Sequence, residues 1–185
     1  MNKIITFEGI DGSGKTTLIQ ALYHHFATQG KVVWPTNEPW SISEIDSDPF
    51  VATMQLVMDR RHHCNVLKST SYDIALIDRF DLSTAAYQGY GDGIDLTLIA
   101  ILNNSATEGV DVARRIWLDV PVDVAVQRRT QKRGELVNPN EIKRLERVND
   151  GYGMMGFLGM LCRIDATQPP DDVLREAIAL IEEIL

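Results

Sequence analysis

The sequence has little of three features that would each point to a different kind of protein. Its two cysteines, Cys64 and Cys162, fit no metal-binding spacing, so we expect free thiols rather than a disulfide or a zinc site. No apolar run approaches the roughly 18 to 20 residues that a membrane helix needs, and no signal peptide precedes the first apolar segment. We therefore expect a cytoplasmic protein with no membrane partner.

Positive charge is also scarce, because 18 Lys and Arg residues stand against 26 Asp and Glu residues and give a formal net charge of −8. Binding to long nucleic acid depends on many Lys and Arg contacts to phosphate, so this balance argues against it. Small-molecule nucleotides remain compatible, since they need only a local basic pocket. The basic residues are unevenly spread, with a cluster at Arg128, Arg129, Lys132 and Arg133.

Length and composition indicate one globular unit. At 185 residues, with 44% apolar and 24% charged residues, the chain is expected to form a single domain over residues 1–185. Short apolar runs alternate with helical patterns, which predicts an α/β fold with a mainly parallel sheet. We expect strands at residues 4–7, 31–35, 74–77, 116–118 and 162–164, helices ending near residue 30 and beginning near residue 170, and a surface loop at 40–49.

The most specific pattern is a phosphate-binding loop at residues 9–16, which fits GxxxxGK(S/T) directly after a strand and at the start of a helix. Its glycines let backbone N–H groups turn toward a polyphosphate. Lys15, expected to face solvent, would bridge the outer phosphates, and the Thr16 hydroxyl would ligate Mg²⁺. The predicted nucleotide-binding residues are Gly9, Asp11, Gly12, Ser13, Gly14, Lys15, Thr16 and Thr17.

A phosphate-binding loop alone does not separate a kinase from a GTPase switch or a motor ATPase. No Asn-Lys-x-Asp segment is present to read guanine, which weakens the switch hypothesis. Asp78 closes the apolar run 74–77, where enzymes of this kind place a carboxylate near Mg²⁺. The predicted metal residues are therefore Thr16 and Asp78, although an Asp at a strand end can instead cap the following turn.

Three segments together resemble the bacterial thymidylate kinase family. They are residues 7–17, residues 78–89 and residues 164–169, and their order and spacing match the family. The most specific is Asp-Arg-Phe at 78–80 followed by Ser-Thr-Ala-Ala-Tyr-Gln-Gly at 83–89. A basic segment at about 127–140 resembles the family's lid. The resemblance covers most of the chain and implies a three-layer P-loop NTPase fold with five strands. It also implies a kinase that uses ATP and Mg²⁺, with dTMP as the first candidate acceptor, and a homodimer.

The resemblance also implies catalytic roles. Arg79 would hold the acceptor phosphate near the donor, and family members carry a further arginine in either the phosphate-binding loop or the lid. Ser13 occupies the loop position here, so the lid arginines, including Arg128, are expected to serve, unless they only form a solvated helix face. The implied catalytic residues are Lys15, Asp78, Arg79, Arg129 and Arg133.

On the acceptor side, the resemblance implies that Asp11 contacts the sugar 3′-hydroxyl and that Tyr87 lies where a ribose 2′-hydroxyl would go. That pairing favours a deoxynucleotide, although Tyr87 could be an ordinary core aromatic. Arg60 would hydrogen-bond the pyrimidine. The full acceptor set is Asp11, Glu38, Leu56, Arg60, Arg79, Thr84, Tyr87 and Gln88.

Three departures from the family all fall on the acceptor side. Asn37 stands where an arginine is common, the segment between Pro39 and Arg60 is short, and Leu56 replaces an aromatic that stacks on thymine. They leave dUMP or a 5-substituted dUMP as alternative acceptors. A nucleotide-binding protein without catalysis is a further alternative, against which the retained Lys15 and Asp78 argue.

Overall fold

The five predicted strands form one sheet. The computed structural model describes residues 2–134 and 136–185, and its strands are β1 (Lys3–Glu8), β2 (Val33–Asn37), β3 (Ile74–Asp78), β4 (Arg114–Asp119) and β5 (Cys162–Asp165). They pair in parallel in the order β2-β3-β1-β4-β5. The second strand begins two residues later than expected, because the Val32 N–H is donated to the Asp73 carboxylate at 2.7 Å before the ladder starts.

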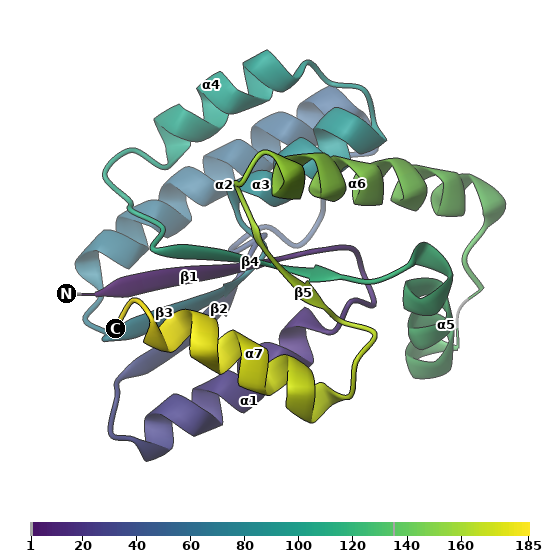
Figure 1. Ribbon diagram of the computed structural model, residues 1–185. Coiled ribbons are helices and arrows are strands. Elements are labelled where there is room, and N and C mark those ends of the chain that lie inside the picture. Colours follow the sequence, from purple (N-terminus) through teal and green to yellow (C-terminus); the bar gives the residue numbers. More distant parts are fainter. Residues whose placement is uncertain (1, 135) are drawn as a thin grey trace.

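Helices cover both faces of the sheet, which confirms the predicted fold class. Figure 1 shows α1 (Lys15–Thr28) and α7 (Pro170–Glu182) on one face, and α2 (Pro49–Ser69), α3 (Asp81–Thr84), α4 (Leu96–Ala106) and α6 (Pro139–Phe157) on the other. A short π-helix, η1 (Ala85–Gly91), continues α3, and α5 (Val122–Arg133) follows β4. Among the described residues, no helix is long and apolar enough to cross a bilayer.

The pleat of β1 divides its side chains between the two faces. Ile5 and Phe7 pack in one buried cluster with apolar residues of α1 and α7, whereas Ile4 packs in a second with Cys64 of α2. Cys64 and Cys162 are free thiols, as expected. Burial, with the Glu38 carboxylate nearby, raises the pKa of Cys64 to about 12, which leaves this thiol unreactive at neutral pH.

The carboxyl ends of β1, β2 and β3 meet at one edge of the sheet, where ligands of open parallel sheets bind. The phosphate-binding loop leaves β1 at this edge and runs into α1. Within it, Gly12 has φ +95°, and a Cβ there would lie 2.3 Å from the Ala125 carbonyl oxygen of α5. Only glycine fits this position, because α5 packs directly on the loop.

We predict that packing between α6 and η1 makes Gly151→Ala destabilising. A Cβ at Gly151 would lie 2.6 Å from ring atoms of Tyr90, so the substitution should lower the free energy of unfolding by about 1–3 kcal/mol. Gly153→Ala, on the same helix, is the control, because its Cβ would meet only Trp117 at 4.0 Å. That change should be neutral or stabilise by up to about 1 kcal/mol. Urea unfolding of both variants measures the difference, and equal stability would contradict the packing argument.

Candidate active site

The first cavity is a cleft of about 640 Å³ over the phosphate-binding loop. Six of the predicted nucleotide-binding residues line it, namely Asp11, Gly12, Gly14, Lys15, Thr16 and Thr17. The other two lie beneath the loop surface: the Gly9 carbonyl accepts a hydrogen bond from Lys15, and Ser13 is buried. The cleft therefore collects backbone N–H groups, a helix N-terminus and a lysine, the arrangement that holds polyphosphates.

Lys15 is buried rather than solvent-facing, which corrects one expectation from the sequence. Its ammonium group donates to the carbonyl oxygens of Gly9 and Ile10 at 2.9 and 3.1 Å and to Ser13 Oγ at 3.3 Å. Burial, and then repulsion from Arg79, lower the pKa of Lys15 to about 7. The lysine folds back on its own loop, where the carbonyl oxygens accept its N–H donors.

Thr16 and Asp78 come together as the sequence predicted for a metal site. The Thr16 hydroxyl donates to Asp78 Oδ2 at 2.7 Å, and both residues line the cleft. A hydroxyl and a carboxylate beside a phosphate site suit Mg²⁺, which is usually held by one or two protein oxygens together with substrate phosphates and water. The described residues hold no cluster of three His, Cys, Asp or Glu side chains that would suggest an all-protein metal cage.

The second cavity has a volume of about 180 Å³ and brings together the predicted acceptor residues. All of them line it: Asp11, Glu38, Leu56, Arg60, Arg79, Thr84, Tyr87 and Gln88. Four residues that were not among the predicted site residues complete the wall: Pro39, Ile45, Phe80 and Ser83. Ile45 lies in an irregular loop, where no local pattern marks a cavity residue. Tyr87 is thus a cavity residue whose ring also packs against the core.

Arg79 lies where the two cavities meet, since both are lined by Arg79, Asp11 and Glu38. Its Nη2 donates to Asp11 Oδ1 at 2.6 Å and to the Tyr87 hydroxyl at 3.0 Å, and its guanidinium lies 4.6 Å from the Tyr87 ring centre. Burial opposes ionisation of Asp11, but Arg79 and Lys15 outweigh it and hold the pKa of Asp11 below its usual range. A cation is thereby fixed between the two sites.

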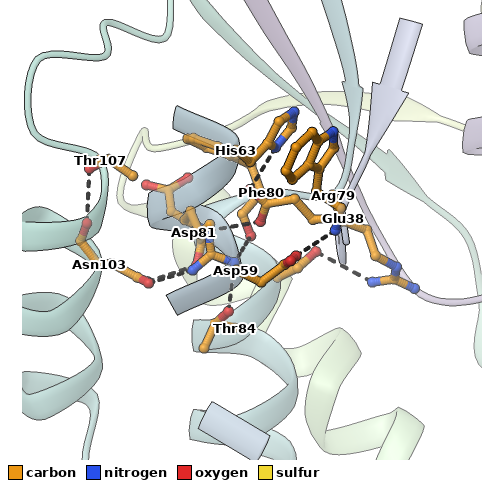
Figure 2. A network of polar contacts seen from close by, with 12 residues as sticks. Glu38, Asp59, His63, Arg79, Phe80, Asp81, Thr84, Asn103 and Thr107 are labelled. Atoms are coloured by element: carbon orange, nitrogen blue, oxygen red, sulfur yellow. Dashed lines mark hydrogen bonds and ion pairs between the residues drawn. The ribbon is translucent and has the colours of Figure 1, made fainter. Parts of the chain in front are cut away.

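Arg60 is a buried arginine held on several sides. Its Nε donates to Glu38 Oε2 at 2.8 Å, Nη1 to Asn103 Oδ1 at 2.6 Å, and Nη2 to the Phe80 carbonyl and Thr84 Oγ1. Figure 2 shows these partners arriving from separate elements, with Asn103 on α4 and Thr84 at the end of α3. The guanidinium therefore keeps one orientation at the cavity wall.

Two further buried or stacked residues were not expected from the sequence. His63 Nδ1 donates to Glu38 Oε1 at 3.1 Å, so both Glu38 oxygens have partners. Arg144 of α6 forms a double ion pair with Asp92 and lies 5.4 Å from the Tyr87 ring centre. Their partners lie far away in the chain, and both residues stand in polar, charged runs of their helices, so no local signal in the sequence marked them.

The predicted lid includes the end of α5 and reaches the start of α6. Arg128 and Arg129 line the phosphate cleft together with Lys132. Arg128 donates to the Ala166 carbonyl at 2.9 Å, and Arg129 pairs with Glu141 at 2.8 Å. The side chain of Arg133 lies outside the described part of the structure, so its predicted role is not tested by this geometry.

The loop, the Thr16–Asp78 pair and the two adjoining cavities together define a class of protein. A phosphate-binding loop on a parallel sheet, a Thr and Asp pair beside it, and a second cavity that shares an arginine with the first are the parts of a P-loop nucleotide kinase. Two sites that meet at a fixed cation suit transfer of a phosphoryl group from one nucleotide to another.

Comparison with known proteins gives the family. Residues 7–177 match the family model described as thymidylate kinase. The chain is 33% identical to a thymidylate kinase of Sulfurihydrogenibium sp. over 82% of both chains, and 34% identical to a probable thymidylate kinase 1 of Saccharolobus solfataricus over the full length of both. The crystal structure of an Ehrlichia chaffeensis thymidylate kinase superposes with a TM-score of 0.75 at 28% identity, covering 97% of this chain and 98% of the other. The chain belongs to the thymidylate kinase family, whose members are ATP-dependent nucleoside monophosphate kinases.

The buried lysine leads to a prediction about protons. Without nucleotide, Lys15 has a pKa of about 7, and a polyphosphate beside it will raise that pKa by favouring the charged form. At pH 8 most Lys15 is neutral when free and charged when bound, so ATP binding should take up close to one proton. At pH 6 Lys15 is already charged in the free protein, so proton uptake by Lys15 on ATP binding should nearly vanish.

Calorimetric titration of ATP in two buffers with different ionisation enthalpies measures this uptake. At pH 8 the nucleotide adds little, because the second pKa of a phosphate is about 6. Lys15→Arg is the matched control, since arginine stays charged and should show no uptake. Equal uptake in the wild type and Lys15→Arg at pH 8 would assign the proton to another group.

Proposed function

We propose that this protein transfers the γ-phosphoryl group of ATP to dTMP and releases ADP and dTDP. The observation that carries the proposal is that all predicted acceptor residues line one cavity, and that this cavity meets the phosphate cleft at Arg79. The thymidylate kinase relatives support the same acceptor. Little covalent chemistry is asked of the protein, so positioning and charge neutralisation carry the reaction.

On the donor side, we assign the outer phosphates of ATP to Lys15 and the loop N–H groups. Lys15 would leave the Gly9 and Ile10 carbonyls and turn to the phosphates, regaining its charge. Thr16 and Asp78 are the residues that would hold Mg²⁺, which neutralises charge on the phosphate oxygens when bound. Their hydrogen bond keeps the two oxygen ligands together.

On the transfer path, Arg79 would bind the acceptor phosphate, and Arg129 would add charge from the lid. Asp11 and Tyr87 hold the Arg79 guanidinium at the junction of the cavities. Arg129 lines the same cleft. Because Ser13 stands in the phosphate-binding loop where some family members have arginine, we propose that this enzyme belongs to the lid-arginine type, with Arg133 as a second candidate.

In the acceptor cavity, Tyr87 would leave no space for a ribose 2′-hydroxyl, and its own hydroxyl is already fixed by Asp11 and Arg79. Arg60 carries five N–H donors, and one on Nη1 has no partner within residues 2–134 and 136–185. That N–H is proposed to bind the pyrimidine. Pro39, Ile45 and Leu56 supply an apolar wall.

The departures of the acceptor side keep dUMP and 5-substituted dUMP as the alternative acceptors, and a protein that only binds nucleotides as the alternative function. A coupled assay of ADP release over ribo- and deoxynucleoside monophosphates tests all of them together. Turnover highest with dTMP supports the proposal, turnover highest with dUMP selects the first alternative, and no turnover with any acceptor selects the second.

Three other expectations stay predictions of the sequence: a single domain, a homodimer and a cytoplasmic location.

We predict that Arg79→Ala lowers kcat by about 10²–10³-fold, the loss typical of removing one preorganised donor at a reacting group. The KM for ATP should change little, because the proposed partners of Arg79 are the acceptor phosphate and the transferring group. Arg79→Lys should recover only part of kcat, since a point charge does not reproduce the planar guanidinium.

Arg114→Ala is the control for the loss of an arginine, because Arg114 pairs with Glu183 and lines neither cavity. Steady-state kinetics with ATP and dTMP varied separately provide the measurement. A change confined to the KM for ATP in Arg79→Ala would move Arg79 to the donor side.

We predict that Leu56→Phe tightens dTMP binding by up to about tenfold, because stacking of aromatic rings adds about 0.5–1.5 kcal/mol beyond area burial. Space for the ring is expected at Ile45, which is 44% exposed on a loop at the cavity mouth. The gain should appear in Kd rather than kcat, since the base is held alike in the ground and transition states.

Leu56→Met is the matched control, because it conserves volume without adding a ring and should leave Kd unchanged. Calorimetric titration of dTMP into the folded variants gives both values. Weaker binding in Leu56→Phe would mean that the cavity is already filled at this position.

A further inference from the structure

Glu8 is a fully buried carboxylate to which the proposed chemistry assigns no role. It is the last residue of β1 and 0% exposed. The strand pleat turns it to the same face as Ile4, toward the helices that carry the acceptor site. Burying a charge costs free energy unless hydrogen bonds compensate for it, so the partners of the Glu8 carboxylate indicate its role.

The Glu8 carboxylate is bound to the segment that follows Arg79. Oε1 accepts the backbone N–H of Phe80 at 3.0 Å, and Oε2 accepts the Ser83 hydroxyl at 2.5 Å. The Tyr152 hydroxyl lies 2.9 Å from Ser83 Oγ and 3.5 Å from Glu8 Oε2. Both carboxylate oxygens therefore have donors, and two of those donors belong to residues that follow Arg79, one and four positions later.

Arg79 needs such support because its backbone is strained. Its φ of 67° is in the left-handed region, which costs a non-glycine residue free energy unless its surroundings hold it there. The Arg79 N–H is donated to the Phe7 carbonyl at 2.9 Å, and the next N–H, of Phe80, goes to Glu8. Phe7 and Glu8, the last two residues of β1, thus accept hydrogen bonds from the amides of Arg79 and Phe80, which lie on either side of the strained Arg79 backbone.

The side chain of Arg79 is reached by a second route. Its Nη1 donates to Ser83 Oγ at 3.3 Å, and the same hydroxyl donates its hydrogen bond to Glu8. While Glu8 is ionised, it accepts the hydrogen bond from the Ser83 hydroxyl, and the lone pairs of Ser83 Oγ stay free to accept from Arg79 and Tyr152. A protonated Glu8 would instead donate to Ser83 Oγ and occupy one of those lone pairs.

We propose that Glu8 is a positioning residue for phosphoryl transfer, whose carboxylate holds Arg79 through the Phe80 amide and the Ser83 hydroxyl. This inference rests on the proposed function, in which Arg79 binds the acceptor phosphate. Glu8 touches no substrate itself, because it lines neither cavity. It acts by keeping the guanidinium at the junction of the two sites.

The surroundings of Glu8 bring its titration close to neutral pH. Burial raises its pKa to about 7, against the hydrogen bond from Ser83. The elements packed around Glu8 each place a charged or titratable group near its carboxylate. These groups are Lys15 of α1, Arg60 of α2, Arg79, Asp81 of α3 and Tyr152 of α6. Ionised Glu8, and with it the stronger hold on Arg79, should therefore dominate above pH 7.

Glu8→Gln tests the inference, because glutamine keeps the shape and the acceptor for Phe80 but loses the charge and the acceptor for Ser83. With saturating ATP and dTMP at pH 8, kcat should fall by about tenfold or more, the effect expected for a misplaced hydrogen bond to a charged group. The KM for ATP should stay within about threefold, since Lys15 and the loop are untouched.

Tyr152→Phe is the matched control. It removes a buried hydroxyl from the same cluster, so it should cost a comparable part of the stability, but no hydrogen bond joins it to Arg79. Its kcat should stay within about twofold of the wild type. Ser83→Ala interrupts the same link from α3 and should reproduce the kcat loss, which covers the case in which Glu8→Gln does not fold.

The pH profile is the readout that a merely structural role would not move. In the wild type, kcat at saturating substrates should rise between about pH 6 and pH 8 as Glu8 ionises, and in Glu8→Gln this rise should disappear. Wild-type kcat in Glu8→Gln, or equal kcat losses in Glu8→Gln and Tyr152→Phe, would overturn the inference. If the wild type itself does not phosphorylate dTMP or another acceptor, the proposed function fails instead.

Discussion

The parallel pairing of β1 with β3 is the constraint on which the site depends. In its register Phe7 lies opposite Asp78, and the Arg79 N–H continues the ladder to the Phe7 carbonyl. The phosphate-binding loop leaves β1 at this level, so the Asp78 carboxylate and the Arg79 guanidinium stand beside it. A slip of one residue would turn every side chain of β3 to the other face, and the two cavities would no longer share Arg79.

Two carboxylates, the partly exposed Asp11 and the buried Glu38, hold the cations of the site in place. Arg79 is held by Asp11, and Arg60 by Glu38, whose second oxygen contacts His63. Desolvation makes such pairs weak contributors to stability, but each leaves a guanidinium with one orientation. Positioning of this kind is what phosphoryl transfer asks of a protein. The overall charge of −8 is compatible with a phosphate site because the cations are local and their partners are within the fold.

The acceptor side has the polar residues that the family resemblance implies, but its apolar lining differs. Asn37, where the family commonly has arginine, turns its amide to the Pro39 carbonyl at 2.9 Å and lines the phosphate cleft. Leu56 and Ile45 give the second cavity an aliphatic surface in place of a stacking ring. Of the departures read from the sequence, Asn37 thus lines the phosphate cleft and Leu56 lines the second cavity, while the phosphate-binding loop is complete.

The sequence by itself determined the parallel α/β fold and the phosphate-binding loop, because each is written in a local pattern: apolar runs with period-specific spacing, and a glycine-rich turn before a helix. The acceptor residues were implied by the family resemblance; the fold brings them to one cavity, and their role stays a prediction. The sequence predicted Lys15 as a solvent-facing residue, and that was wrong, because the loop carbonyls that bury it are arranged only in the folded turn. Tertiary structure alone decided the roles of Glu8, Asn103 and Arg144. Their partners lie 72, 43 and 52 positions away in the chain, at Phe80, Arg60 and Asp92, and contacts across such separations follow from packing rather than from local sequence.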